Sequence, residues 1–241
     1  AMNNGFYYVN AIPAIYPVFL RNENGETYID PRTGLLTYDY GDVLGRPFGF
    51  GINPAGALHL DKQKQVQHTV NAQGGLEVKL YKGLKLSVDA GLHYFNNLYS
   101  DLTNKYYGDA ATIGRLLQQS MNSLSFTAKE MLSYTTTVSD HMIDAAIVHE
   151  NLYYRQNYIY GYKAYLADGE SLNLSNAIQM NSIEGNSEGF AMDSYLARFT
   201  YSYDERYLIS ANYRADGSSR YAPGHRWGHF GSVSAAWSFT N

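Results

Sequence analysis

The sequence predicts an all-β fold, specifically a segment of an antiparallel transmembrane β-barrel. Apolar and polar residues alternate over unusually long stretches, and short turns alternate with long connections along the chain. Tyrosine, with 24 of the 241 residues, is strongly represented. Alternation with a period of two is typical of strands with two different faces. Tyrosine suits strands whose rings lie where apolar surroundings meet water.

The composition excludes several classes of protein. The chain has 18 Lys and Arg against 22 Asp and Glu, a net charge of −4, whereas nucleic-acid-binding proteins usually carry a basic face. We therefore expect no nucleic-acid partner. There is no cysteine, which excludes disulfide scaffolds, thiolate zinc sites and cysteine nucleophiles.

Residues 1–65 are predicted to form a loop region on the side of the long connections. Pro13 and Pro17 interrupt any strand ladder there. Residues 27–30 and 35–38 could pair as a small hairpin across the turn sequence Pro31-Arg32-Thr33-Gly34. We expect this region to be extracellular, because the strand that follows it runs toward a short turn.

Seven strands are predicted from the alternation that begins at residue 66. They are expected at residues 66–80, 84–97, 121–138, 141–155, 190–203, 207–217 and 229–239. In the first of them, apolar residues at even positions alternate with polar residues such as Gln67 and Lys79. Together with the loops, these strands are predicted to form a single partial barrel domain over residues 66–241.

The connections between the predicted strands are short at one end and long at the other. The turns at 81–83, 139–140 and 204–206 have two or three residues each. The connections at about 98–120, 156–189 and 217–228 are much longer. Outer-membrane barrels have short periplasmic turns and long extracellular loops, so this orientation is predicted. Within the first long connection, Asp109 could cap a short helix through Gln119.

The barrel interpretation assigns the two faces of the strands to lipid and to a wet lumen. Phe199 and Trp237 are expected to face lipid, whereas Arg198 and Arg214 are expected to face the lumen. Glu130 is the exception, because it falls in register with the apolar face. We expect either that it lies near the outer membrane interface, where an acid costs little, or that a β-bulge changes its side.

A soluble antiparallel β-sandwich that binds glycans without transporting them is the alternative. Each polar face would then be the wet side of a sheet. The predicted strands exceed the usual five or six residues, and their apolar faces end in tyrosines, which favours the membrane barrel.

Several motifs carry a family resemblance. Near the C-terminus they are Tyr201-Ser202-Tyr203-Asp204-Glu205-Arg206-Tyr207-Leu208, Arg214-Ala215-Asp216-Gly217-Ser218-Ser219-Arg220-Tyr221 and Arg226-Trp227-Gly228. Upstream they are Ile15-Tyr16-Pro17-Val18-Phe19-Leu20, Asn53-Pro54 and Tyr81-Lys82-Gly83-Leu84-Lys85. In order and spacing these segments resemble SusC/RagA-type TonB-dependent outer-membrane transporters of Bacteroidota. The resemblance covers nearly the whole chain, but only a middle segment of the family's barrel.

The resemblance implies an importer in the outer membrane of a Gram-negative cell rather than an enzyme. It implies a SusD-like surface lipoprotein as partner, and the TonB–ExbB–ExbD complex acting through other segments of the family. Outer-membrane lipid would surround the barrel, and the substrate would be an oligosaccharide or an oligopeptide, with the choice left open. No cofactor is implied.

No catalytic or metal site stands out in the sequence. His225 and His229 have metal-ligand spacing but no evident carboxylate partner. Aromatic rings near the long connections are the remaining candidates, because rings stack on sugars and tyrosine hydroxyls bond to polar groups. The candidate substrate-binding residues are Tyr106, Tyr107, Tyr160, Tyr162, Tyr165, Tyr221 and Trp227. An aromatic girdle or packing of the loops is the competing explanation for these rings.

Overall fold

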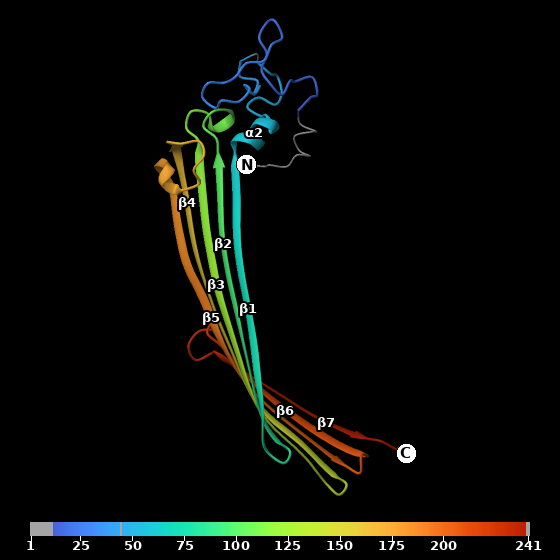
Figure 1. Cartoon of the computed structure of the whole chain (residues 1–241). Helices are drawn as coiled ribbons and strands as arrows, with labels where there is room; N and C mark the ends of the chain where they lie inside the picture. The colour runs from blue at the N-terminus through green and yellow to red at the C-terminus, as the bar shows by residue number, and fades with distance from the viewer. Residues whose placement is uncertain (1–11, 44, 240–241) are drawn as a thin grey trace. The chain divides into compact units, whose positions relative to one another are not determined.

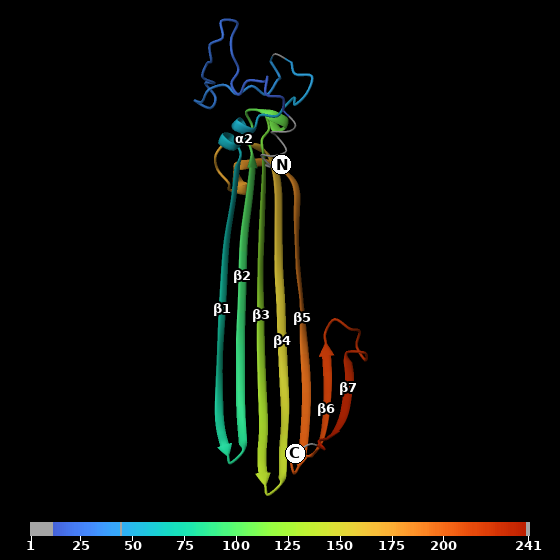
Figure 2. The ribbon, with the colours of Figure 1, turned by 90° about the vertical axis from the view of Figure 1, so that its right-hand side faces the viewer.

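The computed structural model describes residues 12–43 and 45–239. These residues form one seven-stranded sheet in which the strands follow one another in chain order, as Figure 1 and Figure 2 show. The strands are β1 (Lys62–Tyr81), β2 (Leu84–Thr103), β3 (Arg115–Val138), β4 (His141–Leu166), β5 (Ala177–Tyr203), β6 (Tyr207–Ser218) and β7 (Trp227–Trp237). The predicted all-β antiparallel fold is confirmed. The sandwich alternative is wrong for the described residues, because a sandwich needs a second sheet.

Strands β1 to β5 are longer than the alternation predicts. They run from 20 residues in β1 to 27 residues in β5. Much of the connections expected at 98–120 and 156–189 is therefore strand, and the remaining connections are 104–114, 167–176 and 219–226. In contrast, β6 and β7 have 12 and 11 residues, close to the length that crosses a bilayer in a tilted strand.

The chain divides into two compact units. The first contains residues 1–67, 97–121 and 158–186, and we call it the loop unit. The second contains residues 68–96, 122–157 and 187–241, and we call it the turn unit, because all three short turns belong to it.

Two small buried clusters stabilise the loop unit. Their buried members are Tyr38, Tyr40, Leu60 and Tyr107 in the first cluster and Leu102, Leu116, Leu166 and Ala177 in the second. In the first cluster the rings of Tyr40 and Tyr107 stack in parallel with their centroids 5.1 Å apart. Both clusters join segments that are far apart in the sequence, so long-range packing decides the local structure here.

The loop unit contains a helix that the alternation does not predict, α2 (Pro54–Leu60). Asn53 caps it, because its side-chain oxygen accepts a hydrogen bond from the Gly56 N–H at 3.0 Å. The Asn53 amide also donates to the carbonyl oxygens of Val18 and Asp39 at 2.8 and 2.9 Å. Pro54 lies in the first turn of the helix, where a backbone N–H would have no intrahelical acceptor, so proline is tolerated there. Among the described residues, no helix is long and apolar enough to cross a membrane.

The prediction of a helix from Asp109 to Gln119 is wrong. Only a single 3₁₀ turn, Gly108–Ala110, is present, and β3 already begins at Arg115. Gly114 adopts a φ of 62°, in the left-handed region, which ends any helix before it can continue.

The segment before α2 contains short pairings. Ile29 bridges Leu36 in antiparallel fashion, and the Asp30 N–H donates to the Leu35 carbonyl oxygen at 2.8 Å. Gly34, with a φ of 70°, lies in the turn between them. The residues expected to pair as a small hairpin are therefore next to each other in the structure.

The sheet of the turn unit has two chemically different faces. In the register of β5, β6 and β7, Phe199 lies opposite Ala211, which lies opposite Val233. Arg198 lies opposite Asn212 in the same register. Residues directly opposite each other share a face, so the structure separates the apolar and the polar residues as the alternation predicts. We call these the apolar face and the polar face.

The apolar face of the turn unit is not covered by any described part of the chain. Phe199, Val233 and Trp237 are 44%, 79% and 61% exposed. A soluble protein rarely leaves such a continuous apolar surface open to water, so this face needs an apolar environment outside the described residues.

Candidate functional site

Polar side chains on the polar face of the turn unit pair across strands. The Asp144 carboxylate accepts hydrogen bonds from the Thr135 hydroxyl and from the Arg198 guanidinium, both at 2.8 Å. Lys85 lies 3.3 Å from Glu77. Each of these contacts joins neighbouring strands through exposed or half-exposed groups, which is the arrangement expected of a hydrated surface rather than a protein core.

A hollow of about 760 Å³ lies in the turn unit, with polar-face residues from β1 to β6 in its lining. Two glycines make room for it. A Cβ at Gly75 would lie 2.4 Å from an Asp89 carboxylate oxygen, and a Cβ at Gly91 would lie 2.7 Å from the Thr127 hydroxyl. Side chains at these two positions would therefore displace the polar groups that line the hollow.

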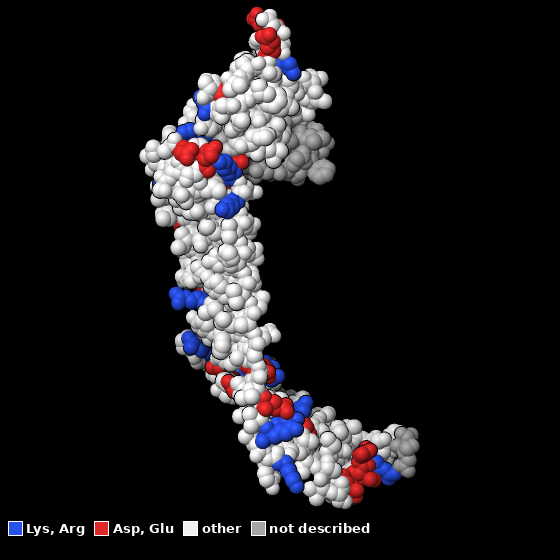
Figure 3. All heavy atoms as spheres, viewed as in Figure 1, with Lys and Arg blue, Asp and Glu red and all other residues white. Residues whose placement is uncertain are grey.

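The charged groups of this hollow are balanced. Asp89, Lys129, Glu150 and Arg214 line it. The Arg214 guanidinium binds Asp216 at 2.7 Å and lies 3.8 Å from Glu150. Neither Asp89 nor Lys129 forms an ion pair within the part of the chain that the structure describes. Figure 3 likewise shows side chains of both signs on the face that it draws. The hollow can therefore hold polar or zwitterionic groups, with no strong preference for one sign of charge.

The described residues offer no group of three His, Asp or Glu side chains that could hold a metal ion. The Nδ1 atom of His229, a metal candidate by spacing, lies 2.7 Å from the Tyr213 hydroxyl. Its ring stands beside that of Tyr213, with the centroids 6.1 Å apart. His229 therefore belongs to an aromatic pair.

Tyr107, one of the expected substrate-binding residues, is buried in the loop unit and only 6% exposed. Its hydroxyl donates to the Asp30 carboxylate, and the Arg32 guanidinium lies 5.1 Å above its ring. Burial and these contacts favour packing of the loop unit over contact with a substrate.

The other tyrosines expected as ligand contacts in the loop unit are not gathered into one site. Tyr106 is partly buried against the first cluster, and the Lys105 ammonium lies 5.8 Å from its ring centroid. Tyr160 and Tyr162 are half-buried on β4, within a strand rather than a loop. Tyr165, near the end of β4, has a φ of 64° and is 47% exposed.

Tyr221 and Trp227 lie in the turn unit and are accessible. Tyr221 is 64% exposed in the connection 219–226, and Trp227 is 49% exposed at the start of β7. The ring centroid of Trp227 lies 6.0 Å from that of Tyr195. These two residues remain candidates for contact with a ligand, with an aromatic girdle as the competing role for Trp227.

A second aromatic group in the turn unit was not expected from the sequence. Tyr154 and Phe190 stand on β4 and β5 with their ring centroids 5.3 Å apart. The Arg220 guanidinium lies 4.2 Å from the Phe190 ring centroid. The tyrosines at 154, 158, 160 and 162 share one parity, and this period of two was the signal that the strand continues past residue 155.

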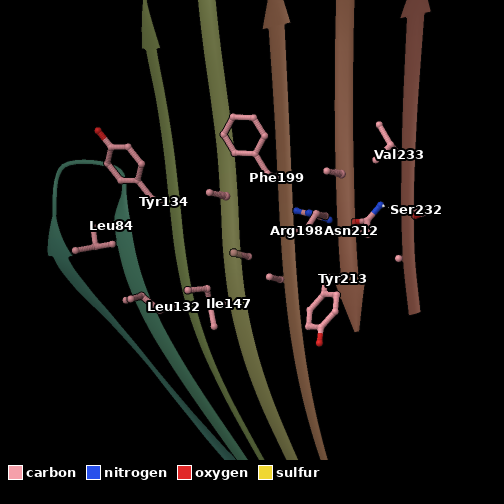
Figure 4. Close-up of a pocket in the computed structure, with 15 residues that line it drawn as sticks. Leu84, Leu132, Tyr134, Ile147, Arg198, Phe199, Asn212, Tyr213, Ser232 and Val233 are labelled. Atoms are coloured by element: carbon pink, nitrogen blue, oxygen red, sulfur yellow. Dashed lines mark hydrogen bonds between the residues drawn. The ribbon is translucent and has the colours of Figure 1, made fainter. Parts of the chain in front are cut away.

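The apolar face of the turn unit carries a hollow of about 510 Å³. Figure 4 shows the rings of Tyr134, Phe199 and Tyr213 standing around it on different strands. Alanines and a glycine between these rings leave the space open, among them Ala145 and Gly231. Its mostly apolar lining suits hydrocarbon rather than a polar substrate.

No family model matches the chain. Among curated proteins, the TonB-dependent receptor P39 of Formosa agariphila is 23% identical to the chain over 221 residues. That alignment covers 88% of this chain and 20% of the receptor.

Solved structures agree with the sequence comparison. The RagAB peptide transporter superposes with a TM-score of 0.71 and 21% identity, covering 92% of this chain and 26% of that chain. The RagAB peptide importer in its "closed-closed" state superposes with a TM-score of 0.72 and 20% identity, over 98% of this chain and 25% of that chain. The chain therefore spans about a fifth to a quarter of the length of the proteins that it matches. These likenesses establish the fold, and the sequence relative supports the resemblance carried by the motifs.

Proposed function

We propose that this chain, whose motifs and fold are those of a segment of a SusC/RagA-type TonB-dependent transporter, forms part of the wall of an outer-membrane importer. The observation that carries the proposal is the open apolar face of the turn unit, on a sheet whose β6 and β7 have the length of a membrane crossing. A barrel wall exposes such a face to lipid and turns its polar face toward a hydrated lumen.

Two groups of aromatic rings support this membrane placement. At one end of β6 the Tyr207 ring stacks on Trp237, with the centroids 6.3 Å apart. At the other end Gly217 lies opposite Trp227, whose ring is beside Tyr195. Ten residues separate Tyr207 from Gly217, which is about 25 Å of height for a strand tilted by about 40°. That height equals the apolar band of an outer-membrane barrel.

We propose oligopeptides as the substrate class, with a SusD-like surface lipoprotein and the TonB–ExbB–ExbD complex as partners. The support is the likeness to structures described as a peptide transporter and a peptide importer. Oligosaccharides are the second candidate, because the exposed rings of Tyr221 and Trp227 could stack on sugars. Nothing in the hollow of the polar face forms a catalytic constellation, so we propose transport without an enzymatic reaction.

The proposed orientation puts the short turns in the periplasm and the connections 104–114, 167–176 and 219–226 outside the cell. Single cysteines in the full-length transporter test it: Glu170→Cys in a long connection and Lys82→Cys in a short turn. Both side chains are exposed, so a reagent that does not cross the outer membrane should label only Glu170→Cys in intact cells. Labelling of Lys82→Cys alone would reverse the orientation.

Uptake by cells that carry the full-length transporter tests the proposed activity. We expect accumulation of a labelled oligopeptide that disappears when the transporter gene is deleted or when a protonophore collapses the energy supply. A labelled oligosaccharide of similar mass is the matched probe for the second candidate. Uptake of neither probe, or uptake that persists without an energised membrane, would contradict the proposal.

A further inference from the structure

Strand β5 continues beyond the end of its neighbour β6. The last paired residues are Met192 on β5 and Ser218 on β6, whereas β5 begins at Ala177. Within the turn unit, residues 187–190 of β5 therefore have no β6 residue opposite them. We call these four residues the free edge.

Every second residue along this part of β5 points its backbone N–H and C=O toward the open side. The Ala191 carbonyl oxygen accepts from the Ser219 N–H, and the Ala191 N–H donates to the Ser219 hydroxyl, both at 2.9 Å. Both groups of Ala191 thus point toward the β6 side. Residues two apart in a regular antiparallel strand point the same way, so Gly189 and Ser187 present their N–H and C=O groups on that side as well.

A hollow of about 390 Å³ adjoins the free edge. It is lined by residues of β4 that include Tyr154, by residues 187–191 of β5 and by Ser219. A Cβ at Gly189 would lie only 2.6 Å from the Tyr154 carbonyl oxygen, so β4 and β5 approach closely there because residue 189 is glycine. The site combines unpaired strand backbone with space for a side chain next to it.

Two charged groups of opposite sign lie beside the free edge. The Glu188 carboxylate accepts only a long hydrogen bond, 3.5 Å, from the Gln156 amide. The Arg220 guanidinium lies over the Phe190 ring. Neither group forms an ion pair with any residue that the structure describes. They are available to the ammonium and carboxylate groups that a peptide carries and a neutral saccharide lacks.

We propose that the free edge of β5 is a strand-addition site for an extended peptide, which would pair with Ser187 and Gly189 and place a side chain in the adjoining hollow. Only a polypeptide backbone offers N–H and C=O groups at the spacing of a strand, whereas a saccharide offers hydroxyls without that repeat. The inference rests on the proposed importer function and names peptides as its substrate class.

The test compares two probes on the full-length transporter in detergent. One is a fluorescein-labelled heptapeptide of alternating threonine and valine, and the other is the same peptide with every internal amide N-methylated. N-methylation removes the donors needed for strand pairing while keeping the side chains. We expect the methylated peptide to bind at least about 10-fold more weakly, since it loses two or more backbone hydrogen bonds.

A matched pair of variants locates the site. Ser187→Pro removes the N–H on the open side, where an edge strand tolerates proline. Ser187→Ala keeps that N–H, and both variants lose the 2.7 Å contact from the Ser187 hydroxyl to Asn157. We expect Ser187→Pro to bind the unmethylated peptide about 3- to 10-fold more weakly than Ser187→Ala. If Ser187→Pro does not fold, the methylated probe on the unmodified transporter still decides.

Three outcomes would overturn the site. They are equal binding of both peptides, equal binding by the two variants, and no binding of the unmethylated peptide because another strand of the transporter already covers the free edge. Energised uptake of the same peptide by cells is measured in parallel. Uptake that is insensitive to N-methylation and to Ser187→Pro would contradict the strand-addition site but would not contradict the importer function.

Discussion

Glu130, the one acid in register with the apolar residues of β3, has partners on the neighbouring strands. Its carboxylate lies 2.9 Å from the His149 Nδ1, and the His149 Nε2 lies 3.3 Å from the Asp193 carboxylate. An imidazole can donate from both nitrogens only when it is protonated, so the three residues form an ion-paired row across β3, β4 and β5. His149 also stacks on Tyr195, with the centroids 4.8 Å apart. This proximity to the aromatic rings near Trp227 favours the membrane interface as the explanation for Glu130.

We predict that His149→Gln destabilises the folded transporter by about 1 kcal/mol, because two neighbouring carboxylates lose the cation between them. The heat-modifiable gel mobility of the full-length protein measures this as a lower unfolding temperature. His141→Gln is the control, because His141 contacts the Tyr201 hydroxyl at 2.6 Å and forms no ion pair with a carboxylate of the described residues. The loss caused by His149→Gln should be smaller in a transporter that already carries Glu130→Gln. If His149→Gln costs the same with and without Glu130→Gln, the proposed ion pairing of His149 with Glu130 is contradicted.

Asp30 is the acid most strongly held in the loop unit. Hydrogen bonds from the Arg32 guanidinium, together with the Tyr107 hydroxyl, lower the pKa of Asp30 to about 2. Burial, and then the Asp30 carboxylate, raise the pKa of Tyr107 to about 12. In the unfolded chain Asp30 would take up a proton near its usual pKa of 3.8. Its stabilising effect is therefore complete above about pH 4 and is lost as the pH falls toward 2.

We predict that Asp30→Asn costs the loop unit about 2 kcal/mol at neutral pH, because the lowered pKa of Asp30 is a stabilisation of that order. Hydrogen exchange of residues 28–38 in the full-length protein should become faster by more than tenfold. Asp42→Asn is the control, since Asp42 is exposed. Between pH 4 and pH 2 the unmodified protein should lose this protection and Asp30→Asn should not. Unchanged exchange in Asp30→Asn would show that the carboxylate does not stabilise the unit.

At the scale of the elements, in the proposed barrel wall the alternation along β5 and β6 decides which side chains meet lipid. Phe199 lies opposite Ala211 on the apolar face, and its neighbour Thr200 lies opposite Ser210 on the polar face. In the proposed barrel wall, a shift of one residue along the strand therefore changes the environment from hydrocarbon to the hydrated lumen.

We predict that Phe199→Arg destabilises the inserted barrel by about 2–4 kcal/mol and that Thr200→Arg costs less than about 1 kcal/mol. The physical reason is the free-energy cost of moving a guanidinium from water to the middle of the hydrocarbon layer. Folded yield in outer-membrane fractions, read by heat-modifiable mobility, measures both variants on the full-length transporter. Similar losses in both would mean that the two faces do not differ in their contact with lipid.

The whole sheet has two open edges within the described residues. It runs from β1 to β7 without closing, and each outer strand lacks a partner on one side. In hydrocarbon every unpaired backbone group costs several kcal/mol, and in the proposed membrane placement the apolar face gains nothing from closure because it would touch lipid in either state. Stability in a membrane must therefore come from strands beyond this sheet.

We predict that residues 1–241, expressed alone with a signal peptide, do not form a folded monomer in the outer membrane. Protease treatment of outer-membrane fractions should degrade the fragment, and no heat-modifiable band should appear. The full-length transporter is the positive control under the same conditions. A monodisperse, folded and water-soluble fragment would contradict the prediction.

The sequence by itself determined the seven strands and the division of the turn unit into two faces. The reason is that alternation of apolar and polar residues can be read from neighbouring positions alone, without knowledge of distant contacts. Arg198 and Phe199 lie on the sides that their positions predict. Asn53-Pro54 also carries a local helix signal, an N-cap asparagine followed by proline, in addition to the family resemblance.

Only the tertiary structure decided how far the strands extend and which candidate residues remain accessible. Beyond residue 155 the spacing of the tyrosines is the local sign of a strand, and pairing with β3 and β5 carries β4 on to Leu166. Tyr107 and Tyr221 look alike in the sequence, yet one is 6% and the other 64% exposed. The burial of Tyr107 depends on contacts with segments more than sixty residues away, such as the one that contains Asp30. A local sequence pattern cannot predict such distant contacts.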